Sequence, residues 1–71
     1  MKKTLFDRAR DYCNGALESR LVARAETEHR PLTDAETKSE AQYILETIDY
    51  AGYDREYTTP IKKACRQVLK N

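Results

Sequence analysis

The stretch TDAETKSEAQYILETIDYAG, residues 33–52, predicts the central helix of the fold. It opens on TDAE, the pattern of a capping box, in which Thr33 accepts from the backbone N–H of Glu36 and the Glu36 side chain reaches back. Apolar residues then recur at helical spacing; they are Ala41, Ile44, Leu45, Ile48 and Ala51. Gly52 supplies the left-handed position that ends many helices. We therefore expect a helix over about residues 34–51.

The segment TTPIKKACRQVLKN, residues 58–71, predicts a further helix. Thr59 is suited to cap it, and Pro60 to occupy its first position, where the missing N–H costs nothing. One apolar stripe follows; it consists of Ile61, Ala64, Cys65, Val68 and Leu69. The preceding residues 53–59, YDREYTT, are then expected to form a loop between the two helices.

The first half of the chain is also helical in pattern, but its apolar stripe changes direction. The residues that share one face are Leu5, Phe6, Ala9, Tyr12, Cys13 and Ala16. Arg20 then falls in the middle of that face, and the change occurs near Asn14-Gly15, a turn signal. Either the helix breaks there, or one helix presents different faces to different neighbours. Because a glycine inside a helix costs only about 1 kcal/mol, we favour one helix over about residues 4–28.

The predicted architecture is therefore all-α, with residues 1–71 forming a single helical domain. We expect a small three-helix bundle, or four helices if the chain breaks at Asn14-Gly15. In size and helix order the chain resembles several unrelated small bacterial and phage helical regulators, without a family motif.

Charge is unevenly distributed along the chain, although the net charge is only +1. Residues 1–30 hold seven basic and five acidic side chains, residues 31–59 two and seven, and residues 60–71 four and none. The protein's own acids therefore compete for its cations, which weighs against a general polyanion binder.

Cysteine content and hydropathy indicate a cytoplasmic protein. The chain has two cysteines, Cys13 and Cys65, whereas a secreted protein of this size would usually carry more. Both lie on apolar stripes, so we expect buried, reduced thiols. No apolar run is long enough for a signal peptide or a membrane span.

Residues suited to catalysis or metal binding are scarce. A structural zinc site needs about four ligands placed together, whereas His29, Cys13 and Cys65 are far apart in sequence. His29 is better placed to interact with a helix C-terminus. The carboxylate pairs Glu26/Glu28 and Glu36/Glu40 are interpreted as solvated helix faces. We expect a protein without catalytic function, cofactor or metal.

Four tyrosines are concentrated around Gly52. On a helix over residues 34–51, Tyr43 and Tyr50 point roughly 140° away from the core stripe, and Tyr53 and Tyr57 follow. Either these rings pack against the aliphatic stems of neighbouring Lys and Arg side chains, or they form an interface. Because tyrosine and arginine are enriched in binding hot spots, we expect a protein partner to contact a set of five residues. That set is Tyr43, Tyr50, Tyr53, Tyr57 and Arg55.

Arg20 and Arg24 interrupt the apolar face of the first half. Either the bundle ends at that height, so that Arg20 extends its side chain to solvent or pairs with an acid of the middle helix, or a second apolar patch lies beside the two arginines and supports self-association, for example as a homodimer. That patch would consist of Leu17, Leu21, Val22 and Ala25.

The polar face of the last helix is basic, with Lys63, Arg66 and Lys70. Such a face can contact phosphates. A DNA-binding helix-turn-helix motif is less well matched, because the predicted loop over residues 53–59 is longer than the usual turn and contains two acidic residues. The main hypothesis is therefore a regulator or inhibitor that binds a larger protein or complex, and this reading allows a phage or another mobile element as its source. The alternative is a small nucleic-acid-binding protein that uses the basic last helix.

Overall fold

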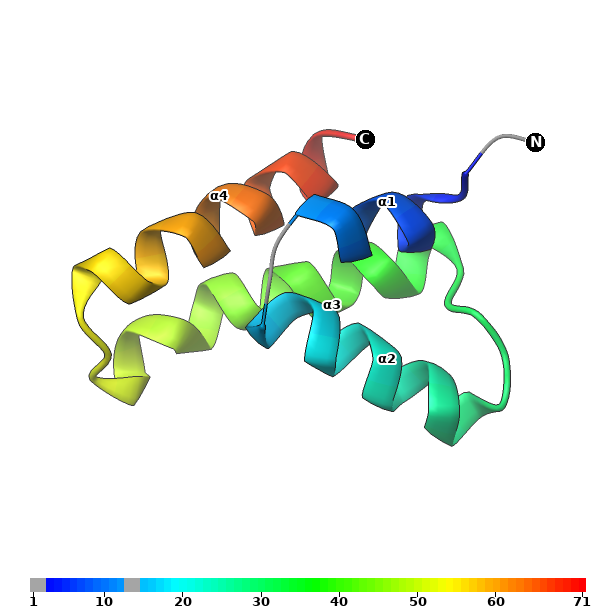
Figure 1. Ribbon diagram of the computed structural model, residues 1–71, viewed down its shortest axis with the longest axis horizontal. Helices are drawn as coiled ribbons and strands as arrows, with labels where there is room; N and C mark the ends of the chain where they lie inside the picture. Colours follow the sequence, from blue (N-terminus) through cyan, green and yellow to red (C-terminus); the bar gives the residue numbers. More distant parts are fainter. Residues whose placement is uncertain (1–2, 13–14) are drawn as a thin grey trace.

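The computed structural model describes residues 3–12 and 15–71, and within them the chain is all-α (Figure 1). Four α-helices and one short 3₁₀ helix follow each other along the chain: α1 (Leu5–Tyr12), α2 (Ala16–Glu28), α3 (Asp34–Thr47), η1 (Ile48–Ala51) and α4 (Arg55–Lys70). The predicted all-α bundle is confirmed. The four-helix form is the one observed, and the expectation of one continuous helix over residues 4–28 is wrong.

Gly15 separates α1 from α2. Its φ of +76° lies in the left-handed region, which glycine adopts without the steric cost of a Cβ; Asn14 and Cys13 lie outside the described residues. The chain changes direction at this break, and as a result Leu17 and Leu21 of α2 are completely buried in the core. Their burial explains why the apolar stripe changes direction in sequence. It also corrects the proposed self-association patch, because neither leucine is available to a second copy.

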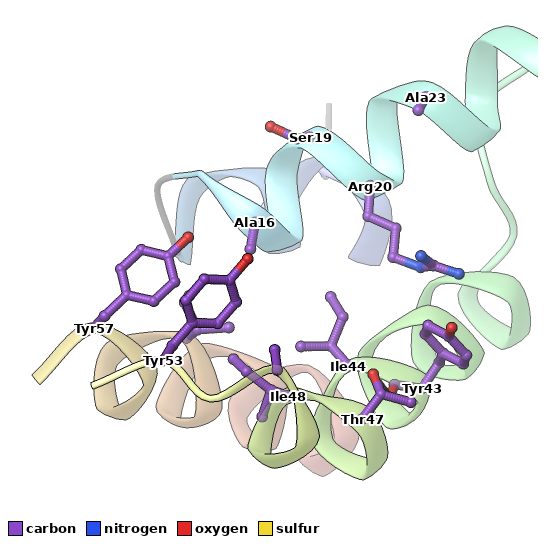
Figure 2. Close-up of a pocket in the computed structure, with 12 residues that line it drawn as sticks. Ala16, Ser19, Arg20, Ala23, Tyr43, Ile44, Thr47, Ile48, Tyr53 and Tyr57 are labelled. Atoms are coloured by element: carbon purple, nitrogen blue, oxygen red, sulfur yellow. Dashed lines mark hydrogen bonds between the residues drawn. The ribbon is translucent and has the colours of Figure 1, made fainter. Parts of the chain in front are cut away.

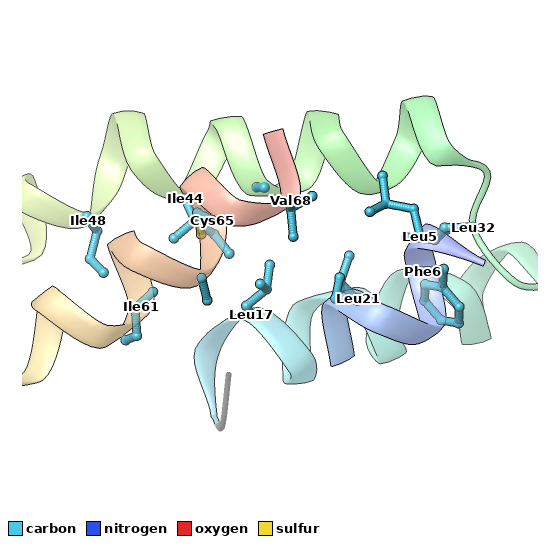
Figure 3. Packing of buried hydrophobic residues seen from close by; sticks show 13 residues of the cluster. Leu5, Phe6, Leu17, Leu21, Leu32, Ile44, Ile48, Ile61, Cys65 and Val68 are labelled. Carbon is cyan, nitrogen blue, oxygen red and sulfur yellow. The ribbon is translucent and has the colours of Figure 1, made fainter. Parts of the chain in front are cut away.

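The hydrophobic core lies between all four helices (Figure 3). Its buried members among the described residues are Leu5, Phe6, Ala9, Leu17, Leu21, Leu32, Ala41, Ile44, Ile48, Ile61, Ala64, Cys65 and Val68. The predicted core positions Ile44 and Ile48 are therefore confirmed, whereas Ala51 is exposed. Burial of this set is the main source of folding free energy, at roughly 25 cal/mol per Å² of apolar surface.

Both ends of the predicted central helix form as expected. The Glu36 N–H donates to Thr33 Oγ1 at 3.1 Å, and the Thr33 N–H donates to Glu36 Oε1 at 2.9 Å, which completes the capping box. At the other end the helix tightens into η1 and stops at Gly52, whose φ is also +76°. The capping box and the terminating glycine thus define α3 and η1 together.

α4 begins at Arg55, five positions before Pro60, so the predicted loop over residues 53–59 is wrong. The N–H groups of Tyr57 and Thr58 donate to the Asp54 carbonyl at 3.0 and 3.1 Å, which starts the helix. Thr58 is buried and extends the apolar stripe of α4 by one turn toward its N-terminus. Packing of this turn therefore outweighs the preference of proline for the first turn of a helix.

No helix among the described residues combines the length and the apolarity that crossing a bilayer requires.

Candidate functional site: a tyrosine-lined groove

A groove of about 450 Å³ runs between α2, the C-terminal half of α3 with η1, and the start of α4 (Figure 2). Its floor is apolar and consists of Ile44, Ile48 and Ile61. These three side chains also belong to the core, so the groove is an opening onto the core rather than a separate cavity. We call it the tyrosine groove, because Tyr43 lies at one end and Tyr53 and Tyr57 lie at the other.

Apart from Arg20, the wall that α2 contributes is made of small side chains. Ala16, Ser19 and Ala23 lie along it at intervals of three and four residues, on one face of the helix. Figure 2 shows them above the isoleucine floor and opposite Thr47 of α3. These small side chains leave the middle of the groove open, because the one long side chain that α2 contributes to the lining, Arg20, lies at the Tyr43 end.

One end of the tyrosine groove is formed by an aromatic pair. The ring centroids of Tyr53 and Tyr57 are 4.9 Å apart, and the ring planes are inclined by 57°. Tilted aromatic pairs at this separation attract each other beyond their burial, by about 0.5–1.5 kcal/mol. The two rings nevertheless stay 60% and 51% exposed, so they hold each other in place while offering their outer surfaces to a ligand.

The other end is held by a network of charged residues. The Arg20 guanidinium lies 4.1 Å from the centroid of the Tyr43 ring, a cation–π contact. Arg20 Nε donates to Glu40 Oε1 at 2.6 Å, and Arg24 Nη1 donates to Glu40 Oε2 at 2.7 Å. Glu40 is only 8% exposed. The prediction that Arg20 pairs with an acid of the middle helix is confirmed, and the interpretation of Glu40 as solvated is wrong.

A second ion-pair cluster ties the α2–α3 turn to the start of α3. Arg30 donates to both carboxylate oxygens of Glu36, at 2.7 and 2.9 Å. The hydrogen bond from Arg30, followed by the one from the Thr33 N–H, lowers the pKa of Glu36 from 4.5 to about 2. His29, beside this cluster, caps α2 in the left-handed conformation. Its position at the helix end agrees with the expected structural role.

The structure separates the residues that were predicted as one tyrosine interface. Tyr43, Tyr53 and Tyr57 line the groove, whereas Tyr50 is 88% exposed and does not contribute to its lining. Arg55 lies at the first position of α4, where it lines a different hollow together with Arg66. Three of the five predicted residues therefore line the groove, Arg55 lines a separate hollow, and Tyr50 lines neither.

The remaining predicted residues lie elsewhere on the surface. Val22 and Ala25 are partly buried and line a hollow of about 440 Å³ beside Phe6. Self-association through these two residues remains a prediction. Lys63, Arg66 and Lys70 are all exposed on α4.

The lining of the groove offers contact area and hydroxyl groups. Its described residues include no His, Cys, Asp or Glu, and the Thr47 hydroxyl already donates to the Tyr43 carbonyl at 2.8 Å. Within residues 3–12 and 15–71, no three His, Cys, Asp or Glu side chains gather in a way that could hold a metal ion. The arrangement is suited to recognising a surface by shape.

Sequence reasoning missed the small-residue wall and Glu40. Ala16, Ser19 and Ala23 carry no motif, and their role depends on which helix lies opposite. Glu40 did leave a signal, because Glu36 and Glu40 repeat the four-residue spacing of Arg20 and Arg24.

Comparison of the chain with known protein families, with curated proteins and with solved structures finds no match.

Proposed function

We propose that this protein is a non-catalytic regulator or inhibitor that binds an amphipathic helix of a larger protein in the tyrosine groove. The observation that carries the proposal is the combination of an apolar floor, a small-residue wall and tyrosines at both ends. Helix-in-groove recognition uses such a shape, with apolar residues of the incoming helix at i, i+3 or i+4, and i+7. Occupying that helix would prevent the larger protein from using it elsewhere.

The tyrosines are suited to supply much of the binding energy. Tyr43 is 48% exposed, and like Tyr53 and Tyr57 it presents a large surface that is already held by neighbours in the unbound protein. Tyrosine is enriched among the few residues that dominate interface affinity. Because these rings are already positioned, a partner pays less conformational entropy to bind them.

The charges around the tyrosine groove indicate which charged side chains a bound helix should carry. The one cation in its lining, Arg20, is already neutralised by Glu40. Asp54 and Glu56 lie next to the aromatic pair, Glu46 lies one turn from Tyr43, and none of the three forms an ion pair within the described part of the chain. The matching helix therefore carries Lys or Arg beside its apolar stripe, and tyrosine rings also attract such cations.

A variant that fills the groove tests this proposal. Ser19→Gln with Ala23→Gln adds bulk to the exposed α2 wall and keeps residues that favour helix. Ser39→Gln with Ala35→Gln makes the same two changes at exposed positions of α3 outside the groove. In both backgrounds, Tyr57 is replaced by the photo-crosslinking residue p-benzoylphenylalanine, and nuclease-treated lysate is irradiated.

The expected result is a crosslinked protein in the control background that is lost in the groove-filled background. Mass spectrometry should place the crosslink in a helical segment with an apolar stripe and flanking Lys or Arg. Equal crosslinking in both backgrounds, or a crosslink to an extended or acidic segment, would refute the proposal.

A further inference from the structure

The outward face of α4 carries a continuous row of cations. Five basic side chains fall within about 100° of arc on a helix with 3.6 residues per turn, and the row is about 22 Å long. They are Arg55, Lys62, Lys63, Arg66 and Lys70. We call this surface the α4 cationic stripe; it lies roughly opposite the buried face formed by Ile61, Cys65 and Val68.

Most of these charges are not neutralised by the protein itself. Lys62 contacts Asp49 at 2.5 Å. For the other four cations of the stripe, no acid among the described residues forms an ion pair. By contrast, Arg20 pairs with one acid, and Arg24 and Arg30 pair with two each. The stripe therefore presents about four positive charges to an external anion, and the two acids Asp54 and Glu56, which form no ion pair within the described residues, flank Arg55 at its N-terminal end.

Two of the arginines converge on one hollow. Arg55 and Arg66 line a depression of about 340 Å³ together with Lys62, Thr59 and Tyr53. Thr58 and Asp49 also line it, and Asp49 is the acid that already neutralises Lys62. Guanidinium groups match phosphate oxygens with two parallel hydrogen bonds. The hollow thus has the donors for a phosphate group, with Arg55 and Arg66 as its principal contacts.

The surroundings of the stripe distinguish between anionic partners. An interfacial membrane helix buries an apolar face in lipid, but the apolar face of α4 is already packed in the core. Tyr53, by contrast, is 60% exposed at the edge of the arginine hollow. Aromatic rings beside a cationic track are how proteins bind single strands, because unpaired bases stack on them.

We propose that the α4 cationic stripe binds the backbone of single-stranded nucleic acid, with Arg55 and Arg66 on phosphates and Tyr53 stacked on a base. Tyr57 and Ile61 reach the tyrosine groove from another face of α4. Tyr53, however, lines both the arginine hollow and the tyrosine groove. The phosphate contacts of Arg55 and Arg66 therefore stand independently of a protein partner in the groove, whereas the stacking position at Tyr53 is shared with it.

Fluorescence anisotropy with a labelled 20-nucleotide oligothymidine tests this site. With about four phosphates neutralised, log K should fall with log salt at a slope of about −2.8, so affinity drops about 50-fold between 50 and 200 mM salt. Arg55→Gln with Arg66→Gln should reduce the slope to about −1.4. Lys3→Gln with Lys38→Gln removes the same charge away from α4 and should keep the wild-type slope. Tyr53→Leu should weaken binding at least about 5-fold.

Two further probes identify the partner. A duplex of the same length should bind more weakly than the single strand, and Tyr53→Leu should not affect that binding. Vesicles containing phosphatidylserine should show no binding that depends on Arg55 and Arg66. If both double variants weakened oligothymidine binding equally, the binding would depend only on net charge and the proposal would be overturned. Tighter binding to the vesicles or to the duplex than to the single strand would also overturn it.

Discussion

Replacing Glu40 with glutamine should destabilise the protein and loosen one end of the tyrosine groove. The carboxylate is 8% exposed and accepts two charge-assisted hydrogen bonds, at 2.6 Å from Arg20 and at 2.7 Å from Arg24. Such bonds contribute about 1.5–3 kcal/mol each when buried. The arginine side chains are 43% and 35% exposed, so solvent screening reduces this contribution. We expect Glu40→Gln to lower the free energy of unfolding by about 2–3 kcal/mol.

Urea denaturation followed by circular dichroism measures this loss directly, and the melting temperature should fall by about 10–20 °C. A double-mutant cycle of Glu40→Gln with Arg20→Gln should give a coupling energy near 1 kcal/mol. Because Arg20 also contacts the Tyr43 ring, the ring resonances of Tyr43 should shift in the same variant. A stability loss below about 0.5 kcal/mol, or strict additivity in the cycle, would show that Glu40 does not hold the two arginines.

Three further predictions address the core, the pH response and the exposed aromatic surface. Ile48→Ala should cost about 2–5 kcal/mol in urea denaturation, since it leaves a cavity in the core; a neutral result would contradict its buried position. The pKa of Glu36 is lowered in the folded protein, so its contribution to stability is present above pH 4.5 and is lost as the pH falls toward about 2. Glu36→Gln should flatten stability measured over that range, whereas Glu46→Gln, at an exposed position, should not. Tyr50→Ala should change the free energy of unfolding by less than about 0.5 kcal/mol, because the ring is 88% exposed, and a larger loss would show that it packs.

Local signals in the sequence predicted the middle of the fold correctly. The capping box at Thr33 and Glu36 and the terminating Gly52 depend on residues a few positions apart, so their outcome changes little with tertiary context. The break at Gly15 was harder to predict. A glycine within a helix costs only about 1 kcal/mol, and the decisive gain, burial of Leu17 and Leu21, depends on helices distant in sequence.

The start of α4 shows a similar competition. Pro60 is a strong signal for the first turn of a helix, and Asp54 is a weaker one at the observed start. Thr58 was assigned to the predicted loop over residues 53–59, yet it is buried and its hydroxyl is positioned to donate to the Arg55 carbonyl at 3.3 Å. The sequence left open whether the four tyrosines are packed or exposed; the structure leaves them 48–88% exposed, and which of them share a groove depends on the placement of α2.

Pro60 gives the two ends of the tyrosine groove different mechanical properties. It cannot donate the hydrogen bond that would run to the Glu56 carbonyl, so the first turn of α4 is joined to the rest of the helix by one bond fewer. Tyr57 is carried on that turn, whereas Tyr43 is braced by Arg20 and Glu40. A helix bound in the groove would therefore contact a more rigid end at Tyr43 and a more flexible end at Tyr57. Residues of different size at one end of the bound helix can then be tolerated, while the register is set at the other.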